Sequence, residues 1–208
     1  MPYSIVYADP PWNYTACSNK IPSRAKAGQT YNAMRMIDIY DFQMPELADD
    51  CVIFMWATAP LMPEALHTMK CWGFEFKTIA FTWIKKNKKE ITTNFWGMGS
   101  WTRSNPEFCL LGTRGNPKAI SHSVHSVIES PLEEHSKKPD CVREKIVELC
   151  GDIPRIELFA RTRVAGWDAV GNQLVSSGHL EYPTAVRSID VDTPPIQTIP
   201  TETKPSSS

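Results

Sequence analysis

Residues 4–12 read SIVYADPPW, and they hold the most informative pattern in the chain. The apolar run at 4–8 predicts a buried strand, and Asp9-Pro10-Pro11-Trp12 follows it directly. The two prolines fix two φ angles and push the residue before each of them toward extended backbone. Because proline has no N–H, this turn offers carbonyl oxygens and the Asp9 carboxylate as hydrogen-bond acceptors, with an aromatic ring beside them.

Such a turn suits a planar ring that carries an amino group. Its two acceptors can take both hydrogens of the amine while Trp12 stacks on the ring. The alternative is structural, namely a proline-stiffened turn whose tryptophan belongs to the core. The place of the turn favours a site, since ligands of open α/β sheets bind beyond the carboxyl ends of the strands.

Further strands and helices alternate along residues 1–175. Strands are predicted at 51–56, 76–84, 107–111 and 155–159, and helices at roughly 61–71 and 140–150. This alternation predicts an α/β fold with a mainly parallel twisted sheet and helices on both faces. Residues 176–208 are rich in Ser, Thr and Pro without an apolar period, which predicts a flexible C-terminal tail after a single domain.

The overall composition excludes several classes of protein. The net charge of −1 excludes a globally basic nucleic-acid coat. The six cysteines form no CxxC pair and several lie in apolar runs, so we expect no disulfide framework and a cytoplasmic location. No apolar run has the length of a membrane span. His122 and His125 lack a third ligand at metal-site spacing, and we expect no metal.

Positive charge is concentrated locally. Residues 10–37 carry four basic residues and no acidic one. Residues 77–118 carry eight basic and two acidic residues, and they also hold Trp83, Phe95, Trp96 and Trp101. Basic groups interleaved with aromatic rings are typical of a nucleic-acid groove. The alternative is a solvated lysine run at 85–89 beside tryptophans that belong to the core.

The turn and the strings around it resemble the MT-A70 family of N6-adenine methyltransferases, which includes the eukaryotic messenger-RNA enzyme and small bacterial and phage DNA methylases. Asp-Pro-Pro-Trp after an apolar strand is similar to the family's motif IV. The other matching strings are YNAM at 31–34, FMW at 54–56, TWIK at 82–85, EFCLLG at 107–112, GNP at 115–117, SKKPD at 136–140, ELFAR at 157–161 and GNQL at 171–174.

The resemblance implies transfer of a methyl group from S-adenosylmethionine (SAM) to the exocyclic amine of adenine, with S-adenosylhomocysteine as product. It implies that Asp9 and the Pro10 carbonyl hold the amine, with Pro11 and Trp12 completing the catalytic turn. It also implies a Rossmann-like methyltransferase fold in permuted order, with the catalytic strand first and the cofactor strand last. We therefore expect strand 4–8 to pair directly, in parallel, with strand 155–159.

The resemblance further implies two sets of binding residues. On the cofactor side they are Asp9, Lys138 (for the methionine carboxylate), Phe159, Arg161, Arg163, Asn172 and Gln173. Arg163 departs from the eukaryotic pattern, which has histidine there. On the substrate side they are Trp12, Tyr31, Trp56, Trp83, Lys85, Lys86, Trp101, Arg103 and Glu107. An adenine in a duplex would have to be flipped into such a site.

These observations lead to one expectation and two alternatives. The expectation is a SAM-dependent DNA adenine methyltransferase of bacterial or phage type, with nucleic acid as its partner, DNA favoured over RNA, and no membrane. A homodimer is one arrangement that the sequence leaves open. The alternatives are an RNA adenosine N6-methyltransferase and a catalytically inactive nucleic-acid-binding partner subunit, although such partners lose the Asp-Pro-Pro-Trp turn that is intact here.

Overall fold

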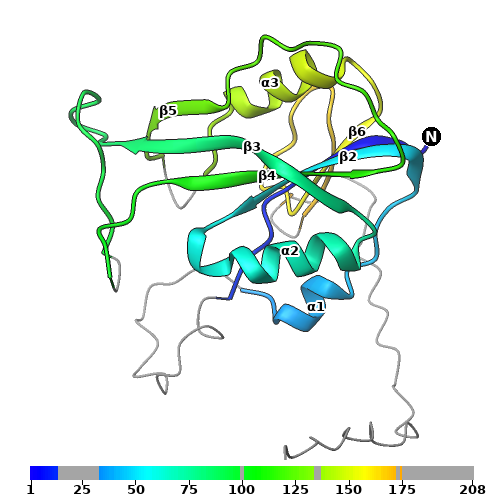
Figure 1. Ribbon diagram of the computed structural model, residues 1–208, viewed down its shortest axis with the longest axis horizontal. Coiled ribbons are helices and arrows are strands. Elements are labelled where there is room, and N and C mark those ends of the chain that lie inside the picture. The colour runs from blue at the N-terminus through cyan, green and yellow to red at the C-terminus, as the bar shows by residue number, and fades with distance from the viewer. Residues whose placement is uncertain (14–32, 99–100, 134–136, 172–173, 175–208) are drawn as a thin grey trace, which may run out of the picture.

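The structure is a computed structural model that describes residues 1–13, 33–98, 101–133, 137–171 and 174. The tail predicted at 176–208 lies outside the described residues, as do the predicted site residues Tyr31, Asn172 and Gln173. The described part forms one twisted sheet with helices on both of its faces (Figure 1).

The sheet has seven strands in the order β5-β3-β4-β2-β1-β6-β7. The strands are β1 (Tyr3–Ala8), β2 (Leu47–Ala57), β3 (Glu75–Lys86), β4 (Glu107–Arg114), β5 (Val127–Pro131), β6 (Arg155–Leu158) and β7 (Asp168–Val170). Strand β4 runs antiparallel to both of its neighbours, and every other pair in the sheet is parallel. The mainly parallel α/β fold is thereby confirmed.

Helices α1 (Met36–Tyr40) and α2 (Met62–Cys71) cover one face of the sheet, and α3 (Cys141–Cys150) covers the other (Figure 1). A 3-10 turn (Ala59–Leu61) leads into α2. Proline stands in the first turn of α2, and Gly73 with φ 83° follows its end, an arrangement that starts and stops a helix efficiently. Apolar side chains of these helices and of the sheet form two cores, one on each face.

Strands β1 and β6 are direct parallel neighbours, with Ala8 opposite Leu158. This pairing confirms that the first strand of the chain lies beside the last strand predicted from the sequence. The elements that the sequence pattern missed are short, namely α1, β5 and β7. Among the described residues no helix is long and apolar enough to cross a membrane.

Candidate active site

Several predicted site residues meet at one edge of the sheet. The carboxyl ends of the parallel strands β1, β2 and β3 lie there, and so does the amino end of the antiparallel strand β4. Asp9 follows β1, Lys85 lies near the end of β3, and Glu107 is the first residue of β4. Lys138 reaches the same place from the segment that precedes α3.

Four charged side chains form a continuous chain at this edge. The Lys138 ammonium donates to Asp9 Oδ2 at 3.0 Å and lies 3.2 Å from Glu107 Oε2. The other oxygen of Glu107 accepts from the Lys85 ammonium at 2.6 Å. The lysine and glutamate side chains are 11–16% exposed and that of Asp9 is 25% exposed. Positive and negative groups therefore alternate in a largely water-excluded chain whose outer end is Asp9.

Burial and neighbouring charges shift the pKa values in this chain. Burial raises the pKa of Asp9 above its ordinary value of 3.8, although Lys138 and Arg161 act to lower it. Burial acts to lower the pKa of Lys138, but Asp9 and Glu107 outweigh it and the pKa is raised. Burial acts to raise the pKa of Glu107, but Lys138 and Lys85 outweigh it and the pKa is lowered. Lys138 and Glu107 thus stay charged at neutral pH.

The turn after β1 is held from both sides. The Trp12 N–H donates to the Pro10 carbonyl at 2.8 Å, and the Met34 N–H donates to the Pro11 carbonyl at 3.1 Å. The Trp12 indole donates to the Trp56 carbonyl at 3.0 Å, and only 8% of Trp12 is exposed. The observed arrangement therefore agrees in part with each interpretation of this turn, the binding site and the structural turn. The turn lies at the charged edge of the sheet, and its tryptophan packs into the core.

Trp56 and Trp83 differ from the sequence interpretation. They were expected to contact the substrate, but their exposed fractions are 0% and 1%. Both side chains point into the core on the α3 side of the sheet, where they pack edge to face with ring centroids 6.3 Å apart. The side chains of strands alternate between the two faces, so a tryptophan at the end of a strand can lie beneath a site instead of facing it.

The two lysines of β3 that were predicted to bind the substrate are paired within the protein. Lys85 binds Glu107, and Lys86 donates to Asn94 Oδ1 at 2.9 Å and lies 3.2 Å from Glu129. The backbone of Lys85 is clamped as well, since the Asn105 amide accepts from its N–H and donates to its carbonyl, both at 2.9 Å. Asn105 was not among the predicted site residues, and its only signal in the sequence is its place just before Pro106 and a strand.

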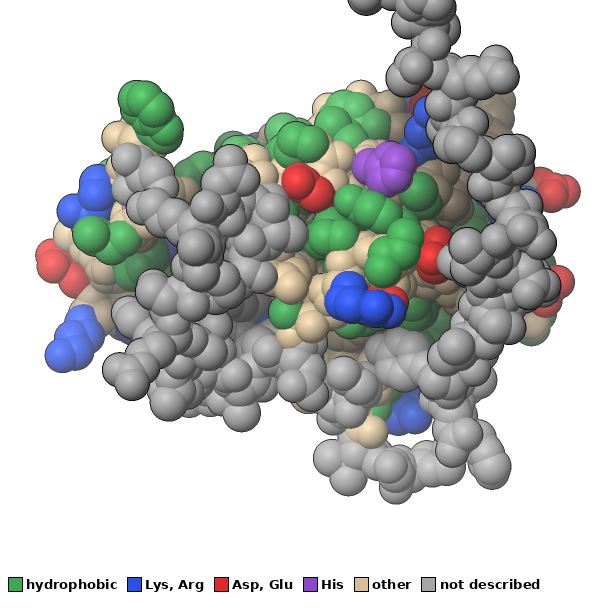
Figure 2. Space-filling model, turned by 90° about the horizontal axis from the view of Figure 1, so that it is seen from below, with side chains coloured by type: hydrophobic (Ala, Val, Ile, Leu, Met, Phe, Trp, Pro, Cys, Tyr) green, Lys and Arg blue, Asp and Glu red, His purple; other side chains and the backbone are tan. Residues whose placement is uncertain are grey.

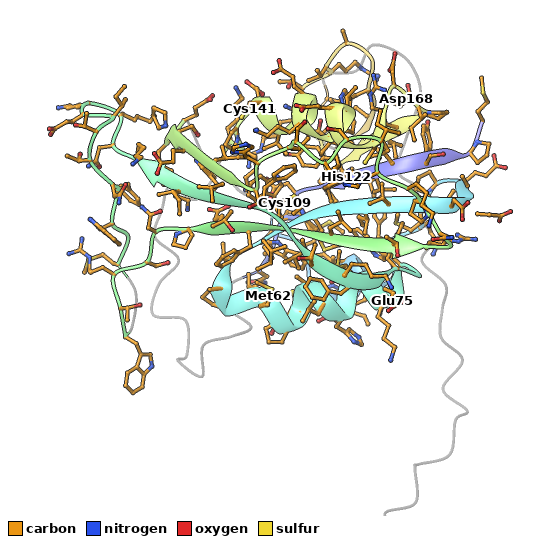
Figure 3. The ribbon with its side chains drawn as sticks, turned by 45° about the horizontal axis from the view of Figure 1, so that its top comes forward. Met62, Glu75, Cys109, His122, Cys141 and Asp168 are labelled. Carbon is orange, nitrogen blue, oxygen red and sulfur yellow. The ribbon has the colours of Figure 1, made fainter. Side chains whose placement is uncertain are left out.

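The loop between β3 and β4 presents a different surface. Within its described residues, 87–98 and 101–106, Trp96, Met98 and Trp101 are 52%, 91% and 99% exposed. Lys88, Lys89 and Arg103 are exposed beside them. The Arg103 guanidinium donates to two carbonyls of the same loop, those of Trp96 and Gly97. Figure 3 shows this loop projecting beyond the sheet, with side chains pointing into solvent.

The predicted cofactor turn after β6 has unusual backbone geometry. Phe159 has φ 60°, the only positive φ of a non-glycine residue among those described. Its ring packs on Phe42 and Trp72, with centroids 5.0 and 6.2 Å away, so its backbone is the part that remains for a ligand. Arg161 lies near Asp9, whose pKa it lowers, whereas Arg163 is exposed.

Gly171 explains how the segment after β7 reaches this turn. A Cβ atom at Gly171 would lie 1.9 Å from the Ala160 carbonyl oxygen, so only glycine fits at this close approach. The Ala160 N–H also donates to the Val170 carbonyl at 3.0 Å. The described chain therefore reaches the 159–161 turn at Gly171, and the predicted pair Asn172-Gln173 lies outside the described residues.

Other reactive groups near the site have no evident catalytic use. Cys109 lies at the centre of the sheet (Figure 3), and burial together with the nearby Asp9 raises its pKa well above the ordinary value for a thiol. It is therefore a protonated core side chain. Among the described residues, no three His, Cys, Asp or Glu side chains are grouped closely enough to hold a metal ion.

Comparison with known proteins gives consistent matches. Residues 3–173 match the sequence pattern of the MT-A70 family. The chain is 30% identical over 200 residues to the type II methyltransferase M.MunI of Mycoplasma sp. The aligned region covers 88% of this chain and 82% of that protein. It is 28% identical over 175 residues to the N(6)-adenosine-methyltransferase catalytic subunit METTL3 of Homo sapiens. The aligned region covers 83% of this chain but 28% of that protein.

A plant relative shows the same difference in length. The MT-A70-like N(6)-adenosine-methyltransferase of Arabidopsis thaliana is 29% identical over 174 residues, which cover 83% of this chain and 24% of that protein. The chain thus spans about a quarter of the length of these eukaryotic relatives and most of the length of the bacterial one.

Proposed function

The chain belongs to the MT-A70 family of methyltransferases, and on that basis we propose that it transfers the methyl group of SAM to the exocyclic amine of adenine in DNA. The observation that carries the proposal is the place of Asp9. This partly buried carboxylate lies at the end of a central strand, next to the Pro10 carbonyl and within reach of a buried ammonium. Two acceptors fixed by a rigid turn fit the two hydrogens of an aromatic amine.

The charged groups at the sheet edge fit the cofactor. SAM carries a carboxylate and a sulfonium, and the edge offers the Lys138 ammonium to the first and the Asp9 carboxylate to the second. Arg161 and the 159–161 turn, with the segment after Gly171, would hold the ribose and adenine side. SAM supplies an already activated methyl group, so the protein's main task is to hold the amine in reacting geometry. The amine would gain the methyl group and release one proton to water, and S-adenosylhomocysteine would leave.

The β3–β4 loop is the proposed nucleic-acid contact. Its exposed rings can stack on bases, and Lys88, Lys89 and Arg103 can face phosphates. Figure 2 shows the face of the molecule that carries α1 and α2, where charged side chains of both signs are scattered among apolar ones. The blue side chains at the left of Figure 2 lie where Figure 1 places the β3–β4 loop. Lys85 and Lys86 are paired within the protein, so they would hold neighbouring side chains of the site in place instead of binding phosphates.

Replacing Lys88 and Lys89 together with alanine should weaken DNA binding and reduce the slope of log K against log salt by about two, one for each lost phosphate contact. The measurement is a salt series of fluorescence anisotropy titrations. A matched control is the double replacement of Lys70 and Lys77, which removes the same charge at the far end of β3 and on α2. Equal slopes for the two double variants would show that the loop only faces solvent.

The pKa of Asp9 predicts the acid side of the pH–rate profile. The ionised carboxylate is the better acceptor for an amine hydrogen, and burial raises the pKa at which that charge is lost. As the pH falls, kcat/KM should therefore decline through an apparent pKa above 3.8. Circular dichroism at each pH separates this loss from acid unfolding. A rate that stays constant down to the ordinary range of an aspartate would contradict the assignment.

The choice of DNA over RNA rests on the extent of the matches. The bacterial type II methyltransferase, of a class that modifies DNA, matches over most of its own length, whereas the adenosine methyltransferases match over about a quarter of theirs. The test is a competition between DNA and RNA oligonucleotides of the same sequence. Faster methylation of DNA is the expected result. Methylation of RNA alone would establish the alternative of an RNA adenosine methyltransferase.

A further inference from the structure

Trp56 makes an unusual set of contacts at the end of β2. Its side chain is fully buried, so it cannot touch a base. Its backbone carbonyl accepts from the Trp12 indole at 3.0 Å, and its own indole donates to the Tyr7 hydroxyl at 2.7 Å. The Lys138 ammonium lies over its ring, 5.7 Å from the centroid. One residue thus contacts both the amine-binding turn and the cofactor lysine.

The ring of Trp56 is an uncharged neighbour of the Lys138 ammonium. The ammonium also contacts the carboxylates of Asp9 and Glu107. A carboxylate of the cofactor would compete with these two for the ammonium, because all three offer the same kind of acceptor. The ring face does not compete, since it attracts a cation through its quadrupole and leaves the N–H donors available.

The orientation of this ring is fixed from below. The hydrogen bond to Tyr7 holds the indole edge, and Trp83 packs against the ring at an interplanar angle of 74°. Tyr7 is itself buried, and the Arg143 guanidinium lies 5.6 Å from the centre of its ring. The ring that contacts the ammonium is therefore held in one orientation. Its position depends on both β1, which carries Tyr7, and β2, which carries Trp56.

We propose that Trp56 is a positioning residue for the cofactor. Its ring holds the Lys138 ammonium in the position from which the ammonium can bind the carboxylate of SAM. The ring does so whether or not Asp9 and Glu107 keep their contacts with the ammonium. This inference rests on the proposed function, in which Lys138 binds that carboxylate. It predicts that changes at Trp56 act on SAM affinity through Lys138. The Trp12 contact uses the backbone carbonyl of Trp56, so a change of the side chain does not remove its acceptor.

The test measures SAM affinity by calorimetry on the full chain. Trp56→Leu removes the ring and should weaken SAM binding about tenfold, while Trp56→Phe keeps a ring face and should stay within about threefold of the wild type. At saturating SAM, kcat should remain within about threefold for both variants, because the amine-binding turn is intact. The matched control is Phe81→Leu, which loses a buried ring of the same core, one that packs on Phe54.

A double-mutant cycle excludes a general packing effect. In a Lys138→Met background, Trp56→Leu should change SAM affinity by less than about twofold, against about tenfold when Lys138 is present, since the cation is gone. If Trp56→Leu does not fold, a tetrafluorinated tryptophan at position 56, which keeps the ring shape and weakens its attraction for a cation, should weaken SAM binding only when Lys138 is present. Wild-type affinity in Trp56→Leu, or an equal loss in Phe81→Leu, would overturn the positioning role of Trp56 and leave the proposed function standing. Absence of SAM binding by the wild type would instead overturn the proposed function.

Discussion

Replacing Asp9 with alanine should lower the rate of methyl transfer by roughly 10³-fold or more and leave the protein folded. The carboxylate is proposed to hold one hydrogen of the amine while the Pro10 carbonyl holds the other. Without it, the amine loses an acceptor that fixes its orientation, and the developing positive charge on nitrogen loses its nearest countercharge. Single-turnover rates at saturating SAM and DNA measure this effect directly.

The fold should survive because the turn does not depend on the Asp9 side chain. The hydrogen bonds of Pro10, Pro11 and Trp12 use backbone atoms and the Trp12 indole. Lys138 keeps Glu107 as a partner at 3.2 Å. DNA binding should persist too, since it is assigned to the β3–β4 loop. The matched variant Asp9→Asn keeps the size and one acceptor oxygen, and its rate should lie between alanine and wild type.

The contrary outcome for Asp9 is equally definite. A folded Asp9→Ala protein that binds DNA and methylates adenine within tenfold of the wild-type rate would remove the carboxylate from the mechanism. The proline-stiffened turn would then be a structural element at the edge of the sheet. Far-UV circular dichroism and anisotropy titrations on the same preparation establish that the variant is folded and binds DNA.

Replacing Lys138 with methionine should weaken SAM binding by about 10- to 100-fold, the equivalent of ~1.5–3 kcal/mol for a charge-assisted hydrogen bond. Methionine keeps most of the side-chain length, so the packing on Trp56 is largely retained. The loss of the cation should also raise the pKa of Asp9, because Lys138 acts to lower that pKa against the effect of burial. The acid limb of the pH–rate profile should therefore move to higher pH in this variant.

Lys137 provides the control for Lys138. It is the preceding residue and has the same charge, but its side chain is 42% exposed and lies 2.7 Å from Glu133 and 2.5 Å from Asp140. Lys137→Met should change SAM affinity by less than about threefold, as is usual for exposed ion pairs. If Lys138→Met bound SAM as tightly as Lys137→Met, the ammonium of Lys138 would serve the ion pairs with Asp9 and Glu107 and not the cofactor.

Local patterns were sufficient to predict much of the fold. The apolar strand before Asp9 and the strand at 155–159 were identified from short runs, and their parallel pairing follows from the permuted order of the family. The direction of β4 could not be read in this way. Nothing in the string EFCLLG distinguishes a parallel strand from an antiparallel one, yet its direction is what brings Glu107 to the same edge as Asp9.

The roles of individual site residues were harder to predict. Lysines 85, 86, 88 and 89 look alike in sequence, but the first two are paired with acidic or amide groups from distant segments and the last two are exposed. Tryptophans 56, 83, 96 and 101 likewise divide into two buried and two exposed rings. Such differences depend on contacts between strands, which a linear pattern does not contain.

The most direct test of the account is to incubate the purified chain with SAM carrying a trideuterated methyl group and an adenine-containing duplex, and to analyse the released nucleosides by mass spectrometry. The proposed function predicts N6-trideuteromethyl-deoxyadenosine in reactions with the wild type and its near absence in reactions with Asp9→Ala. Label on the exocyclic amine of cytosine instead, or no label in either DNA or RNA from a chain that binds both SAM and nucleic acid, would contradict it.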